Sequence, residues 1–580
     1  MANFFTDNPD ILFQFDYLDL SRAADAMEDS YADAQHFDYA PANAAEAVAD
    51  FRRVLELVGQ ISGDFIAPRA EDIDRTGNRI ENNRVIRPVG MDECLNILGQ
   101  ADLMGFTLPR KYGGLNFPNI IYIMATEMVS RADASLMNIF GLQGIAETIN
   151  AFASDDIKDE YLPKFCEGEV TGAMVLTEPD AGSDLQAVKL KAAQDEKGQW
   201  LLNGVKRFIT NGCGEVLLVL ARSELDRSGG LGLSLFICNF SDGVKLRRLE
   251  DKLGIHGSPT CELQFDNVPA RLIGERQRGL VTYVMALMNG ARIGIAAQSL
   301  GIAQAAYQNA RAYAATRKQF EVAIEKLPAV ADLLTQSNID IQAARALAYE
   351  SACYVDLENS LLKKFEFKQL PDDKALVKQM RQDSRHLKRL NAMLTPMAKY
   401  ICSEMCNRVS YNALQVLGGS GFMRDYPVER HYRDARITTI YEGTSQLQIV
   451  AAVRGVMSGT AQKSFSNFSA MDYDGPLRPL AEKLGDLLPV FEEATAYVKE
   501  QPGTEYMDLH GRGIVDAATD IYMAYLLLNQ ARQSDEKLIV ASHYIRQIVP
   551  RVKYNCELVK SGDRSTLDCF ETLAGPVPAE

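Results

Sequence analysis

Four short segments of the chain combine polar side chains with glycine, and each could hold a ligand. The densest of them is the turn Leu176-Thr-Glu-Pro-Asp-Ala-Gly-Ser-Asp184. Its proline and Gly182 shape a loop, and the hydroxyls of Thr177 and Ser183 would lie near the mouth of that loop together with backbone N–H groups. A capped turn between a helix and a strand is the commoner explanation of this composition, so the segment alone assigns no ligand.

The second and third segments could contact a planar ring and a phosphate group. Lys206-Arg-Phe-Ile-Thr-Asn-Gly212 ends a predicted strand at an Asn-Gly turn, where Phe208 could stack on a ring and Thr210 could bond to its atoms. Gln415-Val-Leu-Gly-Gly-Ser-Gly421 follows a predicted helix and could bring its backbone close to phosphate or ribose. It lacks both the GxGxxG spacing and a preceding strand, so it does not meet the dinucleotide-binding fingerprint. A core aromatic residue in a hairpin and a glycine-rich helix end are the commoner explanations.

The fourth segment, Ile440-Tyr-Glu-Gly-Thr-Ser-Gln446, places the carboxylate of Glu442 between an aromatic residue and a glycine. The arginines and Asp434 that precede it are typical of an ion-paired surface. A lone glutamate at a helix end is usually a solvated acid, and this is the interpretation that the segment supports by itself.

The composition of the chain limits its class of function. Hydrophobic residues make up 47% of the chain and charged residues 24%, as in an ordinary globular protein. The formal net charge of -16 argues against nucleic acid as the main partner, because phosphate binding needs a concentrated basic surface. The cysteines form no CxxC pair and the histidines no HExxH pattern, so no metal site is expected. Neither a signal peptide nor an integral membrane segment is evident, which predicts a cytoplasmic protein.

The elements that position these segments are expected to form an α+β multidomain fold. Apolar residues recur with helical periodicity on both sides of a region of short β-branched runs separated by turn signals. Such runs predict a β-sandwich or barrel rather than a parallel Rossmann sheet. A serine-rich segment at 462–474 is a candidate linker. In chain order, the predicted parts are an acidic lead-in (1–45), a helical domain (46–170), a β domain (171–278), a helical bundle (279–460) and a helical extension (461–580).

Taken together in this order and spacing, the four segments resemble the acyl-CoA dehydrogenase family. Further matching stretches are Lys252-Leu-Gly-Ile-His-Gly-Ser-Pro-Thr260, Phe265-Asp-Asn-Val-Pro269, Thr316-Arg-Lys-Gln-Phe320, Tyr426-Pro-Val-Glu-Arg430 and Arg433-Asp-Ala-Arg436. The resemblance covers about residues 50–455, and the residues beyond about 460 are similar to the C-terminal helical extension of the long bacterial members and of very-long-chain enzymes. It implies an N-terminal helical domain, a middle β domain and a C-terminal four-helix bundle followed by the extension.

The resemblance also implies FAD bound at a subunit interface, with residues from two chains around it. The residues expected around the flavin ring are Met174, Leu176, Thr177, Gly182, Ser183, Phe208, Ile209 and Thr210. Those expected to reach the pyrophosphate and adenosine from a neighbouring subunit are Arg317, Phe320, Gln415 and Gly419, and the site would be completed by Thr444 and Gln446. A homo-oligomer follows, with a dimer favoured over a tetramer because the extension often accompanies dimers.

By the same resemblance, Glu442 is the catalytic base. It would take the α-proton of an acyl-CoA while flavin N5 accepts the β-hydride, and electrons would pass to electron-transfer flavoprotein. The expected contacts to the acyl-CoA are Ser183, Asn289, Arg292, Tyr441 and Gly443. Met174 stands where many relatives carry an aromatic residue, and Asn289 replaces a commonly acidic one. An acyl-CoA oxidase and a catalytically silent acyl-CoA-binding assembly partner remain as alternatives, and the sequence does not identify the acyl group.

Overall fold

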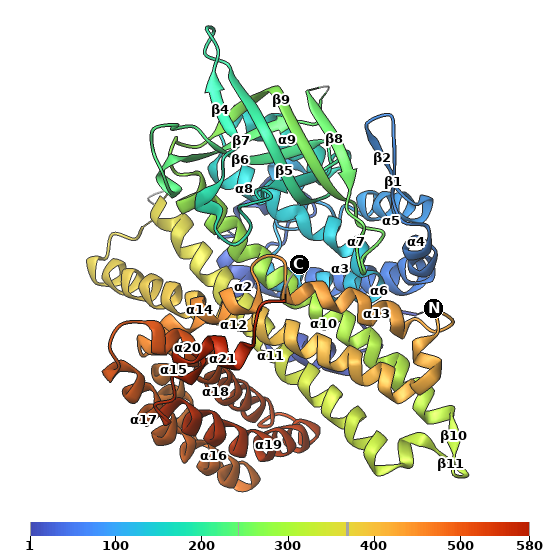
Figure 1. Ribbon diagram of the computed structural model, residues 1–580, viewed down its shortest axis with the longest axis vertical. Helices are drawn as coiled ribbons and strands as arrows, with labels where there is room; N and C mark the ends of the chain where they lie inside the picture. The colour runs from blue at the N-terminus through green and yellow to red at the C-terminus, as the bar shows by residue number, and fades with distance from the viewer. Residues whose placement is uncertain (1, 29, 242, 367–369, 579–580) are drawn as a thin grey trace.

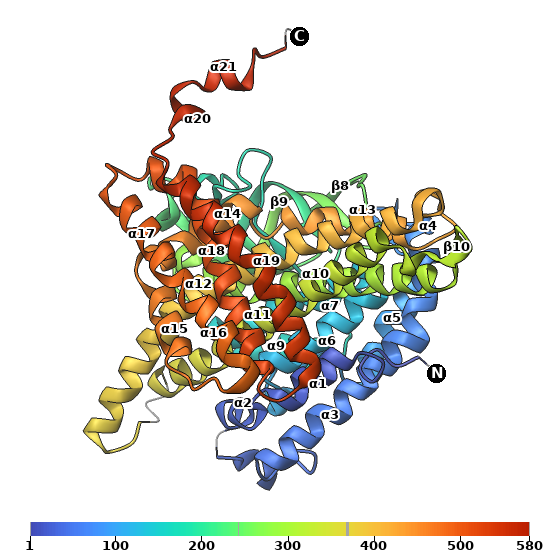
Figure 2. The same cartoon turned by 90° about the horizontal axis from the view of Figure 1, so that it is seen from below.

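The computed structural model describes residues 2–28, 30–241, 243–366 and 370–578, and it shows a β-barrel lying on a large helical body (Figure 1). The predicted order of a helical domain, a β domain and further helices is confirmed. The N-terminal end of the chain lies beside the helical body, whereas the last two short helices carry the C-terminal end away from it (Figure 2).

The N-terminal part is helical except for one small hairpin. Its helices are α1 (Pro9–Tyr17), α2 (Leu20–Met27), α3 (Ala44–Gln60), α4 (Ala70–Thr76), α5 (Val89–Gln100), α6 (Asn119–Ala132), α7 (Ala134–Phe140), α8 (Gly144–Phe152) and α9 (Asp155–Cys166). The hairpin, β1 (Arg79–Glu81) and β2 (Arg84–Ile86), was not expected within this helical region. Asn82 and Asn83 form its two-residue turn, both with positive φ, a conformation that asparagine tolerates.

The middle part is a closed barrel. Of the two predicted architectures, a β-sandwich and a β-barrel, the structure therefore has the barrel. Its strands are β3 (Gly172–Val175), β4 (Lys191–Gln194), β5 (Trp200–Thr210), β6 (Val216–Arg222), β7 (Leu233–Asn239), β8 (Val244–Leu249) and β9 (Thr260–Ile273). The pairing path runs from β6 through β4, β5, β9 and β7 and returns to β6, while β3 pairs with β6 and β8 with β9. Because β6 lies at the centre, nearly all its residues are buried.

A bundle of long helices follows the barrel. Its members are α10 (Met285–Thr316), α11 (Pro328–Glu366), α12 (Lys374–Leu417), α13 (Val428–Ala435) and α14 (Ser445–Met457), with a two-strand hairpin of β10 (Lys318–Gln319) and β11 (Val322–Ala323) after α10. The segment Gly279–Thr316 is long and apolar enough to span a membrane by composition. Its residues Ala296, Ala297 and Leu300 are buried in the protein core, which accounts for the apolar composition of α10.

The C-terminal extension packs on the bundle. It consists of α15 (Thr460–Ser469), α16 (Arg478–Gly485), α17 (Leu487–Glu500), α18 (Glu505–Gln530) and α19 (Asp535–Lys560), followed by the projecting α20 (Ser565–Asp568) and α21 (Phe570–Ala574). The predicted linker at 462–474 is wrong over most of its length, because α15 occupies it through Ser469. Phe465 and Phe468 are buried against Tyr522 and Tyr525, and this aromatic packing outweighs the serines that suggested a linker.

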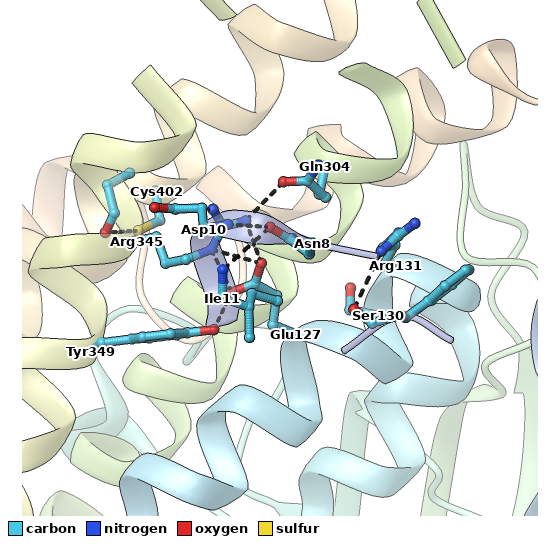
Figure 3. Close-up of polar contacts among 12 residues, drawn as sticks. Asn8, Asp10, Ile11, Glu127, Ser130, Arg131, Gln304, Arg345, Tyr349 and Cys402 are labelled. Atoms are coloured by element: carbon cyan, nitrogen blue, oxygen red, sulfur yellow. Dashed lines mark hydrogen bonds and ion pairs between the residues drawn. The ribbon is translucent and has the colours of Figure 1, made fainter. Parts of the chain in front are cut away.

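A buried ion-pair network joins the lead-in to the helical core (Figure 3). The guanidinium of Arg345 on α11 donates to the carboxylate of Glu127 on α6 at 2.6 Å and to Asp10 on α1. Lys537 of α19 donates to the same Asp10, and Tyr349 donates to Glu127 at 2.7 Å. Because Arg345 and Glu127 are each only 1% exposed, the network fixes four distant parts of the chain to one another.

Candidate active site

Glu442 lies in a turn between the bundle helices α13 and α14, and the backbone of this turn is unusual. Glu442 has φ 54° and Gly443 has φ 90°, so two consecutive residues adopt the left-handed conformation. The positive φ favours glycine at position 443, where a β-carbon would also displace Gln448 Nε2, 2.6 Å away. A left-handed glutamate costs roughly 1–3 kcal/mol, which means that surrounding contacts must hold the turn.

Three side chains hold this turn through hydrogen bonds. The hydroxyl of Tyr441 donates to Gln298 and to Asn138 at 3.2 Å, which fixes the turn against α10 and α7. Gln448 donates to the carbonyls of Glu442 at 3.2 Å and Gly443 at 3.1 Å. The fully buried ammonium of Lys399 on α12 donates to the carbonyls of Thr438 and Gly443. Neither Lys399 nor Gln448 was predicted from the sequence; the signal for Lys399 is a single charge within an apolar stretch of α12, at Met397-Ala-Lys-Tyr-Ile-Cys402.

The carboxylate of Glu442 is half-buried next to two cations. Burial raises its pKa above the usual value, while the charges of Lys399 and Arg292 act in the opposite direction. Arg292 on α10 donates to Asn289 at 3.1 Å, which brings these two predicted substrate residues together. The Nε of Arg292 is buried and has no hydrogen-bond partner among the described residues, so this site retains an unused donor.

The expected flavin-ring residues lie along one edge of the barrel. The polar loop after β3 is fastened to β5, because Arg207 N donates to the carbonyl of Thr177 at 3.0 Å. Fully buried Lys206 donates to the carbonyl of Leu176 at 2.6 Å and pairs with Glu178 at 3.0 Å. These roles of Lys206 and Glu178 were missed, although both residues lie within the quoted segments.

The predicted flavin-ring residues differ in exposure. Phe208 is 51% exposed and has φ 60°, so its ring stands out from the strand. Met174, Thr177 and Thr210 are half-buried. Gly182 and Ser183 are exposed in the loop. The side chains of Leu176 and Ile209 belong to two hydrophobic cores, so only their backbones are available to a ligand.

The expected adenosine-side residues lie in a different part of the molecule. Arg317, Phe320, Gln415 and Gly419 are all exposed, and Phe320 is 86% exposed. They lie around the β10–β11 hairpin and the end of α12, away from the barrel strand β5 (Figure 1). One chain therefore does not bring the two predicted sets of FAD contacts together.

The segment after Glu442 begins α14. Thr444 is the N-cap of this helix, its hydroxyl accepting from Leu447 N at 3.4 Å, and Gln446 is exposed in the first turn. Ser445 donates to Glu404 of α12 at 2.7 Å. Arg512 of the extension lies 3.5 Å from the same carboxylate, so α18 reaches the residues next to the Glu442 turn.

Family models match nearly the whole chain. The model described as the acyl-CoA dehydrogenase N-terminal domain matches residues 49–169, and that of the middle domain matches residues 173–268. The C-terminal domain model matches residues 278–363 and 374–457. A further model, described as acyl-CoA dehydrogenase C terminal, matches residues 457–561.

Individual relatives agree with these matches. The chain is 33% identical over 429 residues to 3-methylmercaptopropionyl-CoA dehydrogenase of Ruegeria pomeroyi, with 69% of each chain covered. It is similar to a chain solved in work on the electron transferring flavoprotein of Acidaminococcus fermentans, with a TM-score of 0.61, 30% identity and coverage of 70% of this chain and 97% of the other. An acyl-CoA dehydrogenase from Bacillus anthracis complexed with FAD shares the fold over 92% of both chains, with a TM-score of 0.74 and 22% identity.

Proposed function

Since the chain belongs to the acyl-CoA dehydrogenase family of FAD-dependent oxidoreductases, we propose that it desaturates an acyl-CoA thioester and that Glu442 is the base. The observation that carries this proposal is the geometry of the catalytic turn. A strained turn holds a half-buried carboxylate next to two cations, whereas a solvated surface acid needs neither strain nor buried partners.

The residues of the site perform complementary tasks in this reaction. Glu442 takes the α-proton of the thioester, and its backbone N–H polarises the thioester carbonyl, which stabilises the enolate-like charge that develops. FAD, when bound beside Phe208, supplies the acceptor for the β-hydride. The unused Nε donor of Arg292 is available to the acyl-CoA, and a substrate covering the turn excludes water from the carboxylate.

The chain provides suitable groups for FAD at both of the predicted contact regions. At the barrel region, the ring of Phe208 is exposed and the side chains of Thr177 and Thr210 are only half-buried. At the other region, a β-carbon built on Gly419 would meet no atom within 4 Å, which leaves its backbone open to close approach by a ligand. Because the two regions are separate in one chain, the proposal includes a homo-oligomer, with a dimer favoured, in which each FAD contacts two subunits.

Replacement of Arg317 by alanine is expected to lower FAD occupancy without unfolding the protein. The exposed guanidinium would otherwise pair with the FAD pyrophosphate, and its loss removes a charge-assisted contact. The ratio of flavin to protein absorbance after gel filtration measures occupancy. Lys318→Ala removes a neighbouring exposed charge and should retain FAD; equal retention in both variants would refute the role of Arg317.

The rate of flavin reduction should rise with pH through the pKa of Glu442. Only the deprotonated carboxylate accepts the α-proton, and burial raises its pKa above that of an exposed glutamate. The active fraction is therefore lost as the pH falls through this raised value. Anaerobic stopped-flow absorbance over a pH series measures the profile, and a rate independent of pH would contradict base catalysis by Glu442.

Electron-transfer flavoprotein is the proposed electron acceptor, and the cytoplasm the proposed location. The similarity to a chain solved in work on an electron transferring flavoprotein supports the dehydrogenase over an oxidase. Air admitted after anaerobic reduction distinguishes them, because rapid reoxidation favours an oxidase. A protein that stays colourless after FAD addition would instead favour a silent binding partner. Flavin bleaching by butyryl-, octanoyl-, palmitoyl-, isobutyryl-, phenylpropionyl- and 3-methylthiopropionyl-CoA would identify the acyl group.

A further inference from the structure

The most deeply buried charge at the catalytic turn belongs to Lys399, and the reaction described above gives it no task. Its side chain is 0% exposed. Burying an ammonium group without partners costs several kcal/mol, so its presence in the core of the bundle requires compensation. The compensating groups all belong to the turn that carries Glu442 or lie next to it.

We propose that Lys399 is a positioning residue that clamps the catalytic turn in its left-handed conformation and keeps the Glu442 carboxylate ionised until substrate binds. This inference rests on the proposed function of Glu442 as the base. It assigns to the middle of α12 a task in the reaction, although Lys399 itself need not touch the substrate.

The clamp follows from the two hydrogen bonds of the ammonium group. Lys399 Nζ donates to the carbonyl of Thr438 at 2.7 Å and to that of Gly443 at 2.8 Å. These carbonyls lie on either side of Glu442, so one cation ties the entrance of the turn to its exit. Charge-assisted hydrogen bonds are about twice as strong as neutral ones, which suits them to hold a turn with two positive φ values.

The electrostatic task follows from the charges that face Glu442. Lys399 on α12 and Arg292 on α10 are the cations that stabilise its carboxylate. Glu404 on α12 and the hydroxyl of Tyr441 on the turn itself are the other titratable groups in this environment. Burial lowers the pKa of Lys399 to about 8, while Glu442 favours its charged form, so the ammonium remains largely charged at neutral pH.

The two cations are not equivalent. Arg292 is only half-buried, and its guanidinium donates to the exposed Asn289, so part of it remains in contact with solvent. Lys399 uses two of its three N–H donors in hydrogen bonds to the turn and is inaccessible to solvent. Arg292 can therefore change partners on substrate binding, whereas the charge of Lys399 is fixed relative to Glu442.

The first test compares pH profiles of anaerobic flavin reduction in single-turnover experiments. The probe is the acyl-CoA of the panel above that reduces the wild-type flavin fastest. Lys399→Met removes both the charge and the donors, and Lys399→Gln removes the charge but keeps an amide donor. Both should shift the low-pH side of the rate profile, its acid limb, to higher pH by about one to three units. The reason is that the Glu442 carboxylate has lost an opposite charge at close range, which raises its pKa. Lys399→Arg keeps the charge and should leave the limb near its wild-type position.

A lower rate at every pH, with the acid limb unmoved in the Met and Gln variants, would show that Lys399 is merely structural and would overturn the proposal. FAD retention after gel filtration serves as the folding control, since Lys399 is not among the expected FAD contacts. If the Met variant does not retain FAD, the Gln variant carries the comparison.

The second test needs no turnover. Thermal midpoints are measured for wild type, Lys399→Met, Glu442→Gln and the double variant, each with bound FAD. Lys399→Met leaves Glu442 half-buried without its main partner, so it should lower the midpoint less when Glu442 is already neutral. If the decreases in thermal midpoint of the two single variants add up to that of the double variant, the electrostatic coupling between Lys399 and Glu442 is contradicted. The same double-mutant cycle can be measured with the milder variant Lys399→Gln in place of Lys399→Met.

These outcomes are separate from those that test the proposed function. Flavin bleaching by acyl-CoA in Glu442→Gln would refute Glu442 as the base. The role of Lys399 alone would be refuted by a different set of results. In that case acyl-CoA bleaches the wild-type flavin but not that of Glu442→Gln, while the Lys399 variants keep the wild-type pH dependence at low pH.

Discussion

Replacement of Glu442 by glutamine abolishes the bleaching of bound flavin by acyl-CoA, while FAD and acyl-CoA remain bound. The amide has nearly the same shape as the carboxylate but cannot accept the α-proton, and a positioned base typically contributes about 10²–10⁴-fold to the rate. Although Lys399 and Arg292 then face a neutral amide, the turn should persist, because Gln448 still donates to the Gly443 carbonyl and Tyr441 still donates to Asn138.

Anaerobic stopped-flow absorbance measures the loss of bleaching, and isothermal titration with acyl-CoA measures the retained binding. Glu404→Gln provides a matched control, because this carboxylate lies on α12 and accepts a hydrogen bond from Ser445 directly after the turn. It should retain most of the rate. Full bleaching in Glu442→Gln would exclude the assignment, and equal losses in the two variants would show that the neighbourhood rather than the base was disturbed.

Replacement of Arg345 by methionine is expected to have the largest effect on stability, about 3–5 kcal/mol of the free energy of unfolding. Methionine fills similar volume but leaves the carboxylate of Glu127 buried with only its bond from Tyr349. It also removes a partner of Asp10, whose pKa the charges of Arg345 and Lys537 hold below its usual value despite burial.

Chemical denaturation at equal FAD and protein concentrations measures this loss, because bound cofactor and subunit association both shift apparent stability. Arg478→Met breaks an exposed ion pair with Asp474, at 3.2 Å, and should change stability by no more than about 1 kcal/mol. The double variant Arg345→Met, Glu127→Gln should recover part of the loss, since the uncompensated charge is gone. An equally small effect of Arg345→Met and Arg478→Met would contradict the importance of the buried network.

The sequence by itself determined the order of the parts and the identity of the candidate base. Helical and strand periodicities arise from neighbours a few residues apart, so they can be recognised without knowledge of the fold. The same locality made Ile440-Tyr-Glu-Gly-Thr-Ser-Gln446 recognisable as a family segment. Local patterns also caused the errors: the serines at 462–474 suggested a linker, whereas the buried rings of Phe465 and Phe468 make it a helix.

Only the tertiary structure decided what surrounds Glu442. Lys399 on α12 and the Gly443 carbonyl that it holds are 44 residues apart in the chain, and Arg292 comes from another helix, α10. Likewise, only packing fastens the loop at Thr177 to the strand at Arg207, and only the fold shows that the β10–β11 hairpin lies in a different region of the same chain. The pKa of a carboxylate depends on burial and on charges in space. The sequence therefore identifies the candidate acid, and the packing of distant segments supplies the burial and the charges that the proposed base requires.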